Sequence, residues 1–105
     1  SHFYKNQYKD TTFVNTSFDE TVLNNMVFQD ILFDENLARN VKMTDTTFKN
    51  VNFKNVEVDN ASFENVKFKN CAFDNVVIKN ATMSQKLINE LQKQHVELEN
   101  VQPSK

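Results

Sequence analysis

Hydrophobic side chains recur at every fifth position along most of this chain, a spacing that neither regular backbone structure produces. Side chains on one face repeat every 3.6 residues in a helix and every 2 residues in a strand. All ten Phe share one phase of the five-residue period: Phe3, Phe13, Phe18, Phe28, Phe33, Phe48, Phe53, Phe63, Phe68 and Phe73. Apolar or aromatic residues complete this phase: Tyr8, Leu23, Ala38, Met43, Val58, Ile78 and Met83. The chain is therefore built from an internal repeat.

Two further positions of the repeat carry their own residue types. The residue two places before each centre is usually small, and the residue two places after it is nearly always Asn, Asp or Glu, becoming Asn in every unit from Asn50 to Asn80. A chain that makes a roughly right-angled turn in each repeat would bury the first two classes and expose the third. Four such sides close a coil of twenty residues, and stacked coils can pair their backbones at the usual strand spacing of about 4.8 Å.

Sorting the centres by twenty gives four columns, of which two are aromatic. One of these stacks Tyr8, Phe28, Phe48 and Phe68, and the next stacks Phe13, Phe33, Phe53 and Phe73. Such rings fill a narrow interior and favour offset contacts between coils. We therefore expect a filled core that leaves no pocket for a cofactor.

The phase-locked pattern resembles the pentapeptide-repeat family. The resemblance covers Phe3 to Met83, and it implies an all-β fold: a right-handed quadrilateral β-helix, here of about four coils. This sequence differs from the commonest bacterial form, which favours Leu at the centre, by its preference for Phe.

The period lapses after Met83, and a different pattern follows. Residues 1–83 are predicted to form the solenoid and 84–105 a C-terminal cap. A capping helix is expected over about 85–94, with Ser84 as N-cap and apolar residues at Leu87, Ile88 and Leu91. Residues 96–100 regain the repeat, and the last five residues are expected to be a frayed tail.

Composition limits the chemistry that the chain can perform. There is no Gly, so turns with positive φ must come from Asn or Asp, and no Gly-rich phosphate loop can exist. His and Cys are too few and too far apart for zinc, and a run of about 18 apolar residues, as a membrane span needs, is absent. Cys71 occupies a small inward position, where a buried thiol behaves as a small hydrophobe. We therefore predict no enzyme, no catalytic, metal-ligating or cofactor-binding residue, no cofactor and no small-molecule substrate.

Charge and surface pattern point to a protein partner. The formal net charge of −2 argues against nucleic acid as a ligand. The position before each centre is usually polar, yet the second coil has aliphatic residues at Val22, Val27, Leu32 and Leu37. This set is a candidate interface, or else the coil is locally irregular or covered by the N-terminal segment. Three sequons offer weak candidate glycosylation sites: Asn15, Asn60 and Asn80.

Three functions remain open from the sequence. The first is a non-catalytic binding module, monomer or dimer, that presents strand edges and side chains to a protein. The units FKNVNF, FKNCAF and FENVKF are similar to those of the luminal domain of the synaptic vesicle glycoprotein 2 family. That similarity implies a luminal or extracellular receptor domain for botulinum neurotoxin A, although Ala72 removes the sequon at Asn70.

The other two functions belong to different classes. Within the same family, DNA-mimicking bacterial proteins act on DNA gyrase as dimers and are cytoplasmic, but the lysines on most coils make a poor polyanion. A structural or engineered solenoid without a natural ligand is the third possibility.

Overall fold

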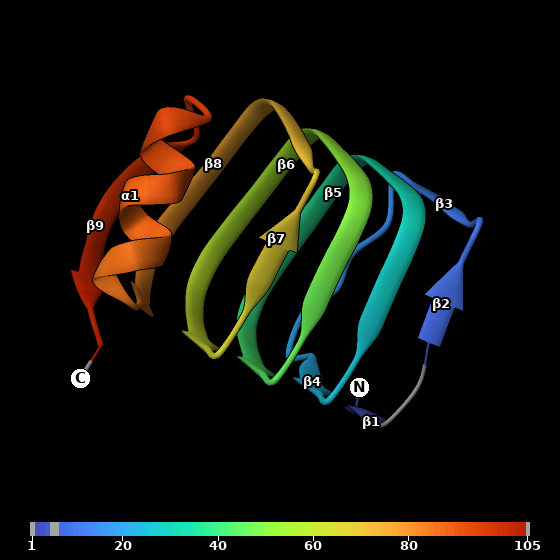
Figure 1. Ribbon diagram of the computed structural model, residues 1–105, viewed down its shortest axis with the longest axis horizontal. Helices are drawn as coiled ribbons and strands as arrows, with labels where there is room; N and C mark the ends of the chain where they lie inside the picture. The colour runs from blue at the N-terminus through green and yellow to red at the C-terminus, as the bar shows by residue number, and fades with distance from the viewer. Residues whose placement is uncertain (1, 5–6, 105) are drawn as a thin grey trace.

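The computed structural model describes residues 2–4 and 7–104, with side chains described from Gln7 to Ser104. One continuous coil of strands is closed at one end by a helix (Figure 1). The elements, in chain order, are β1 (His2–Tyr4), β2 (Gln7–Lys9), β3 (Thr12–Val14), β4 (Val22–Asn24), β5 (Val27–Thr44), β6 (Thr47–Glu64), β7 (Lys67–Lys69), β8 (Ala72–Met83), α1 (Gln85–Lys93) and β9 (Glu97–Pro103).

Every strand pairing is parallel with an offset of twenty residues. Phe28 pairs with Phe48, and Phe48 in turn pairs with Phe68. Strands β5 and β6 each run for 18 residues and therefore bend around several corners. The predicted fold, a right-handed quadrilateral β-helix, is confirmed. The coils continue into a partial fifth turn, slightly beyond the predicted four, because β9 pairs with β8 in the same register.

The corners of the coil are made by the polar position of the repeat. Every fifth residue from Asp10 to Asn80 has a positive φ between 50° and 61°. Asn and Asp tolerate this left-handed conformation best among non-glycine residues, which explains a coil without glycine. Side-chain amides bond from coil to coil at these corners, as from Asn75 Nδ2 to Asn55 Oδ1 at 2.8 Å.

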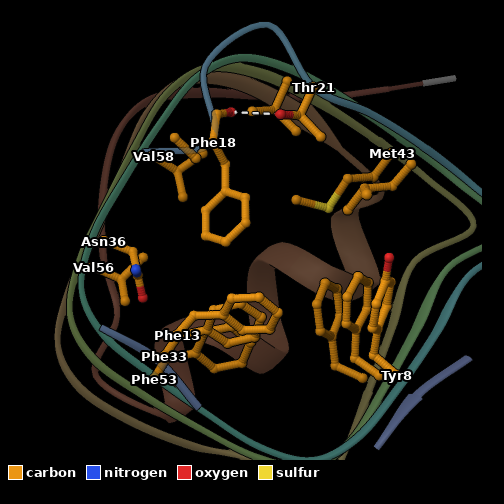
Figure 2. A pocket seen from close by; sticks show the side chains of 15 residues that line it. Tyr8, Phe13, Phe18, Thr21, Phe33, Asn36, Met43, Phe53, Val56 and Val58 are labelled. Atoms are coloured by element: carbon orange, nitrogen blue, oxygen red, sulfur yellow. Dashed lines mark hydrogen bonds between the residues drawn. The ribbon is translucent and has the colours of Figure 1, made fainter. Parts of the chain in front are cut away.

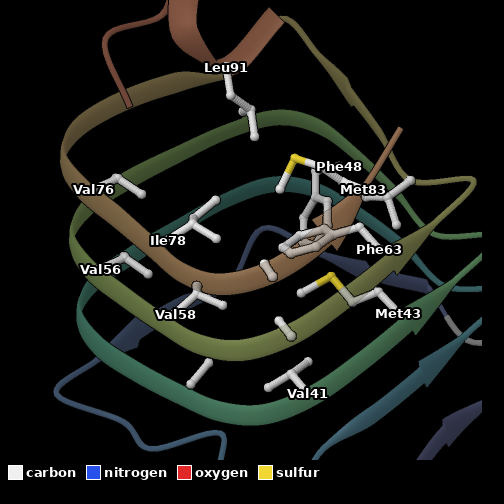
Figure 3. Packing of buried hydrophobic residues seen from close by; sticks show 14 of the residues in the cluster. Val41, Met43, Phe48, Val56, Val58, Phe63, Val76, Ile78, Met83 and Leu91 are labelled. Atoms are coloured by element: carbon white, nitrogen blue, oxygen red, sulfur yellow. The ribbon is translucent and has the colours of Figure 1, made fainter. Parts of the chain in front are cut away.

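The two aromatic columns form nearly parallel stacks. Phe48 lies between Phe28 and Phe68, with ring centroids 5.1 and 5.0 Å away and interplanar angles below 10°. Rings of the neighbouring column meet them edge-on, as Phe53 meets Phe48 at 66°. The other two columns are largely aliphatic, and Figure 3 shows Ile78 above Val58. The small inward positions two residues before these centres stack in the same way, with Val76 above Val56.

Helix α1 closes the C-terminal end of the core. Ser84 caps it by accepting a hydrogen bond from the backbone N–H of Leu87 at 3.1 Å. Leu87, Ile88 and Leu91 are buried, and Leu91 points down into the coil in Figure 3. The helix takes the place of two sides of the fifth turn, and the chain then rejoins the solenoid through β9.

Two sequence-based expectations were wrong. The tail expected after residue 100 is ordered, because β9 continues to Pro103 and Ser104 donates a backbone hydrogen bond to Met83. The interior is also not completely filled. An apolar cavity of about 140 Å³ lies between the first three coils, because Ala38 is the smallest residue of its column (Figure 2).

Candidate functional site

The outward side chains of the solenoid differ in charge from one of its four sides to another. We call side two the surface formed by residues 7–9, 27–29, 47–49 and 67–69, which pair in register. Its outward positions carry four exposed lysines and no carboxylate: Lys9, Lys49, Lys67 and Lys69. Because strands lie about 4.8 Å apart, the charges of Lys49 and Lys69 repel one another.

The opposite surface, side four, has the reverse balance. It comprises residues 17–19, 37–39, 57–59, 77–79 and 97–99, and five of its outward side chains are acidic. Its two cations are both paired: Arg39 lies 2.7 Å from Asp19, and Lys79 lies 3.8 Å from Glu57. No other ion pair occurs among the described residues, so the lysines of side two have no such partner. The solenoid is therefore electrically polarised across its width.

The ion pair between Asp19 and Arg39 on side four changes the pKa of the Asp19 carboxyl group. The Arg39 guanidinium donates hydrogen bonds to the Asp19 carboxylate and lowers the pKa of that group below its ordinary value. At the other end of side four, Glu97 and Glu99 face the same way from β9, and hydrogen bonding to Glu99 raises the pKa of Glu97. The positive charge of Lys79 in the adjacent coil offsets only part of this effect.

Side two ends in a free strand edge. Strand β7 pairs with β6 and has no strand on its other edge among the described residues, because helix α1 occupies the next turn of the chain. In this register the N–H of a central residue donates to the coil above, as Phe18 does to the carbonyl oxygen of Leu37 at 2.8 Å. The equivalent N–H and carbonyl of Phe68 therefore point toward a coil that does not exist.

Two hollows flank this edge, between it and helix α1. The larger, of about 400 Å³, is lined by Lys67, Lys69, Lys86, Leu87 and Glu90 among others. The second, of about 380 Å³, lies over the neighbouring side and contains Cys71. The edge of β7 is therefore reachable from outside, and the larger hollow beside it is lined by three lysines, one carboxylate, that of Glu90, and apolar side chains that include Leu87.

The thiol of Cys71 lies at the wall of the second hollow without a base beside it. Its Sγ lies 3.4 Å from the carbonyl oxygen of Phe48, and burial raises the pKa of the thiol. A raised pKa keeps the thiol protonated near neutral pH, where it is a poor nucleophile. This placement agrees with a residue that serves packing.

The four aliphatic residues of the second coil form a girdle around the solenoid. Val22, Val27, Leu32 and Leu37 lie on four successive sides of one coil, and each is half-buried. Their role as an interface stays a prediction. Val27 alone belongs to side two, where it lies between Gln7 and Thr47.

All three sequon asparagines stand at corners with positive φ. However, the Nδ2 atom that a glycan would need is already bonded in two of them. Asn60 donates to Asn40 Oδ1, and Asn80 donates to Asp59 Oδ1 at 2.8 Å. Glycosylation at these two positions would break the amide contacts between coils, which leaves Asn15 as the best-placed candidate.

The described part of the chain contains neither a candidate metal site nor a helix that could span a membrane. No group of three or more His, Cys, Asp and Glu side chains there could hold a metal ion. No described helix is long and apolar enough to cross a membrane.

The basic side two was missed by sequence reasoning, although the signal was present. The formal net charge of −2 sums over all four sides and therefore hides the difference between them. When the outward positions are also grouped by a spacing of twenty residues, all four lysines fall on side two. The free edge could not be found this way, because it depends on where helix α1 lies.

These features define a class of protein: a parallel β-solenoid with four sides, polar corners and a helical cap. Comparison with protein families then gives its membership. A family model described as "Pentapeptide repeat region" matches residues 1–63, and one described as "Pentapeptide repeats (8 copies)" matches residues 47–85. The chain belongs to the pentapeptide-repeat family. No curated protein matches it.

Proposed function

We propose that this protein is a non-catalytic binding module that captures an extended, acidic segment of a protein partner on side two. The observation that carries the proposal is the free edge of β7 beside lysines that have no carboxylate partner. An incoming strand would lie in the hollow between β7 and α1 and pair with the backbone of Phe68. Addition of a strand to an exposed sheet edge is a common mode of peptide recognition.

Backbone pairing alone is too weak here, so side chains must contribute. Strand β7 has three residues and offers few hydrogen bonds, each worth about 0.5–1.5 kcal/mol net. Side chains of a bound strand alternate between two faces. Carboxylates on the outer face would meet Lys67 and Lys69, and small apolar groups on the inner face would enter the hollow beside Leu87. Charge attraction of this kind raises association rates and selects the partner.

The charge pattern favours this proposal over DNA mimicry directed at gyrase. A DNA mimic must present acidic groups along a continuous surface, but one whole side of this solenoid is basic. The similarity to the luminal domain of synaptic vesicle glycoprotein 2 is compatible with the proposal, since it too implies edge recognition. Binding of the neurotoxin receptor-binding domain would support that particular reading.

The proposal is tested with a fluorescein-labelled peptide in which Glu alternates with Val, measured by fluorescence anisotropy. A matched peptide with Lys in place of Glu is the control ligand. The variant Lys67→Glu with Lys69→Glu should lose binding, at least about tenfold, because two attractions become repulsions. The control variant Lys42→Glu with Lys54→Glu carries the same charge change on other sides and should bind within about threefold of the parent.

A second measurement separates strand addition from charge attraction alone. On addition of the Glu–Val peptide, the amide proton of Phe68 should shift and become protected from exchange. The amide of Phe53, already covered by β8, should not change. Binding that depends on charge but leaves Phe68 unaffected would replace strand addition by surface attraction. Equal binding of both peptides, or of both double variants, would overturn the proposal.

A further inference from the structure

The interior cavity has the size and lining of a small-molecule site. Its volume is about 140 Å³, and nearly all its lining is apolar, with rings from the first three coils forming much of the wall. Figure 2 looks down the solenoid axis and shows Phe18 and Val58 on one wall, the stacked Phe13, Phe33 and Phe53 on the next, and Met43 opposite. An apolar cavity of about 150 Å³ in another protein stays dry and binds benzene.

One polar group in this wall has an unused bonding capacity. Asn36 occupies an inward position that is small and often apolar in other repeats, and it is only 4% exposed. Its Nδ2 donates to the backbone carbonyl of Thr16 at 3.3 Å, but its Oδ1 has no hydrogen-bond partner. Buried carbonyl oxygens without partners are rare, because each costs free energy. A ligand that donates one hydrogen bond would remove this cost.

Two further residues of the lining carry a polar group, Tyr8 and Thr21. The Thr21 hydroxyl donates to the backbone carbonyl of Phe18 at 2.9 Å, and Figure 2 places Thr21 and Asn36 on separate walls. A buried water is held by about three hydrogen bonds, and the cavity does not supply such a set around one point. The lining therefore matches a molecule that is apolar except for a single donor.

We propose that the interior cavity binds a small aromatic molecule with one hydrogen-bond donor, of the phenol class, and that the donor bonds to Asn36 Oδ1. The aromatic columns supply ring faces and edges for the ring of the ligand. This site is independent of side two.

The first coil provides the entrance. Tyr8, Phe13 and Phe18 are only half-buried. The fourth side of this coil is joined to the next coil by three backbone hydrogen bonds, made by Thr16, Phe18 and Glu20, and by the ion pair of Asp19 with Arg39. It belongs to the terminal coil, which packs against another coil on one face only, so its local opening requires less free energy than opening the centre of the solenoid. A ligand can therefore enter past Phe18 without unfolding the protein.

The test compares phenol with toluene, two ligands of nearly equal shape that differ by one donor, in titration calorimetry on the intact protein. The parent should bind both, with phenol favoured by about 2- to 10-fold, as one net hydrogen bond gives. Asn36→Val should keep toluene binding and lose the preference for phenol. The carbonyl of Thr16 keeps the N–H of Leu37 as donor in that variant, so folding should be retained.

Two further variants locate the site. Ala38→Ile should fill the cavity and abolish binding of both probes, whereas Ala72→Ile, the same change at an exposed outward position, should bind like the parent. If the folded parent binds neither probe, the proposal is overturned. It is also overturned if Ala38→Ile binds as the parent does, since the ligand would then lie elsewhere. None of these outcomes depends on the peptide-binding test of side two.

Discussion

The two ends of the solenoid core are built from the same repeat, yet they are packed very differently. At the C-terminal end, Met83 and Leu91 are at most 1% exposed because helix α1 covers this part of the core, although Phe68 and Phe73 beside the two hollows stay half-buried. At the N-terminal end, Phe13 and Phe18 are half-buried and stand over a cavity. The repeat therefore determines the backbone path equally at both ends, but the quality of packing depends on individual residues in the columns.

Column size explains much of this contrast. The column that contains the cavity reads Phe18, Ala38, Val58, Ile78 and Leu98 along the axis. Small residues of adjacent coils cannot move closer to fill a gap, because strand pairing fixes the distance between coils. A single alanine therefore leaves a void, whereas in an irregular core the surroundings would partly collapse into it.

The largest expected effect comes from the sealed end. Leu91→Ala removes a fully buried side chain from α1 and should lower the free energy of unfolding by about 2–5 kcal/mol, measured by urea denaturation. Gln92→Ala, on the exposed face of the same helix, should stay within about 0.5 kcal/mol of the parent. Equal effects of the two substitutions would mean that α1 does not cap the core in solution.

A pair of alanine substitutions tests the contrast in packing directly. Ala81→Ile adds the same atoms to a well-packed region, where Ala81 is 3% exposed, and should destabilise the protein by about 1–3 kcal/mol. Ala38→Ile places them at the cavity and should stabilise it by about 0.5–2 kcal/mol. Thermal melting of both variants checks the signs. Destabilisation of similar size by both would show that the N-terminal core is as tightly filled as the C-terminal one.

Sequence reasoning identified the fold because the repeat is phase-locked. Corner residues, inward columns and the helix capped by Ser84 all follow from local residue types with strict spacing. The cavity is not visible in the repeat pattern, because Ala38 fits the apolar phase and only the fixed strand spacing prevents the core from collapsing around it. Asn36 was overlooked for a similar reason, since one polar residue in an inward position does not disturb the period.

The candidate site was less predictable than the fold. Lys67 and Lys69 can be placed on one side from the sequence, but the free edge of β7 exists only because α1 replaces two sides of a turn. That arrangement depends on packing between distant segments.

Asn36→Val is expected to change the free energy of unfolding by a smaller amount, and it tests the packing at the N-terminal end of the core. The substitution removes an acceptor that has no partner, at the loss of one hydrogen bond of 3.3 Å to Thr16. We expect stabilisation by about 1 kcal/mol, seen as a higher urea midpoint with an unchanged slope. Asn40→Val, at an exposed corner with positive φ, is the control and should be destabilising, because β-branched residues do not tolerate that conformation. Destabilisation by Asn36→Val would mean that Oδ1 has a partner in solution.

The smallest expected effects concern the pH dependence of stability on side four. One carboxylate at each end of this side contributes, and the two contributions have opposite signs. Arg39 lowers the pKa of Asp19 in the folded protein. Asp19 therefore contributes stability above its ordinary pKa of 3.8, and this contribution is lost as the pH falls through the lowered value. At the other end, Glu99 raises the pKa of Glu97. Ionised Glu97 therefore costs stability, fully at neutral pH and progressively less as the pH falls through the raised pKa toward 4.5.

Urea midpoints at about pH 7 and pH 2.5 distinguish the two groups. At neutral pH, Asp19→Asn should lower the midpoint and Glu97→Gln should raise it, and both differences should shrink toward zero in acid. In an Arg39→Gln background, Asp19→Asn should have a smaller effect at neutral pH, because only the backbone N–H of residue 39 and the Ser17 side chain still donate to Asp19. Because both carboxylates are exposed, 0.15 M salt should reduce each difference. A neutral-pH effect of the same sign from both substitutions would contradict the assignment, since the partner of one carboxylate is a cation and that of the other is an acid.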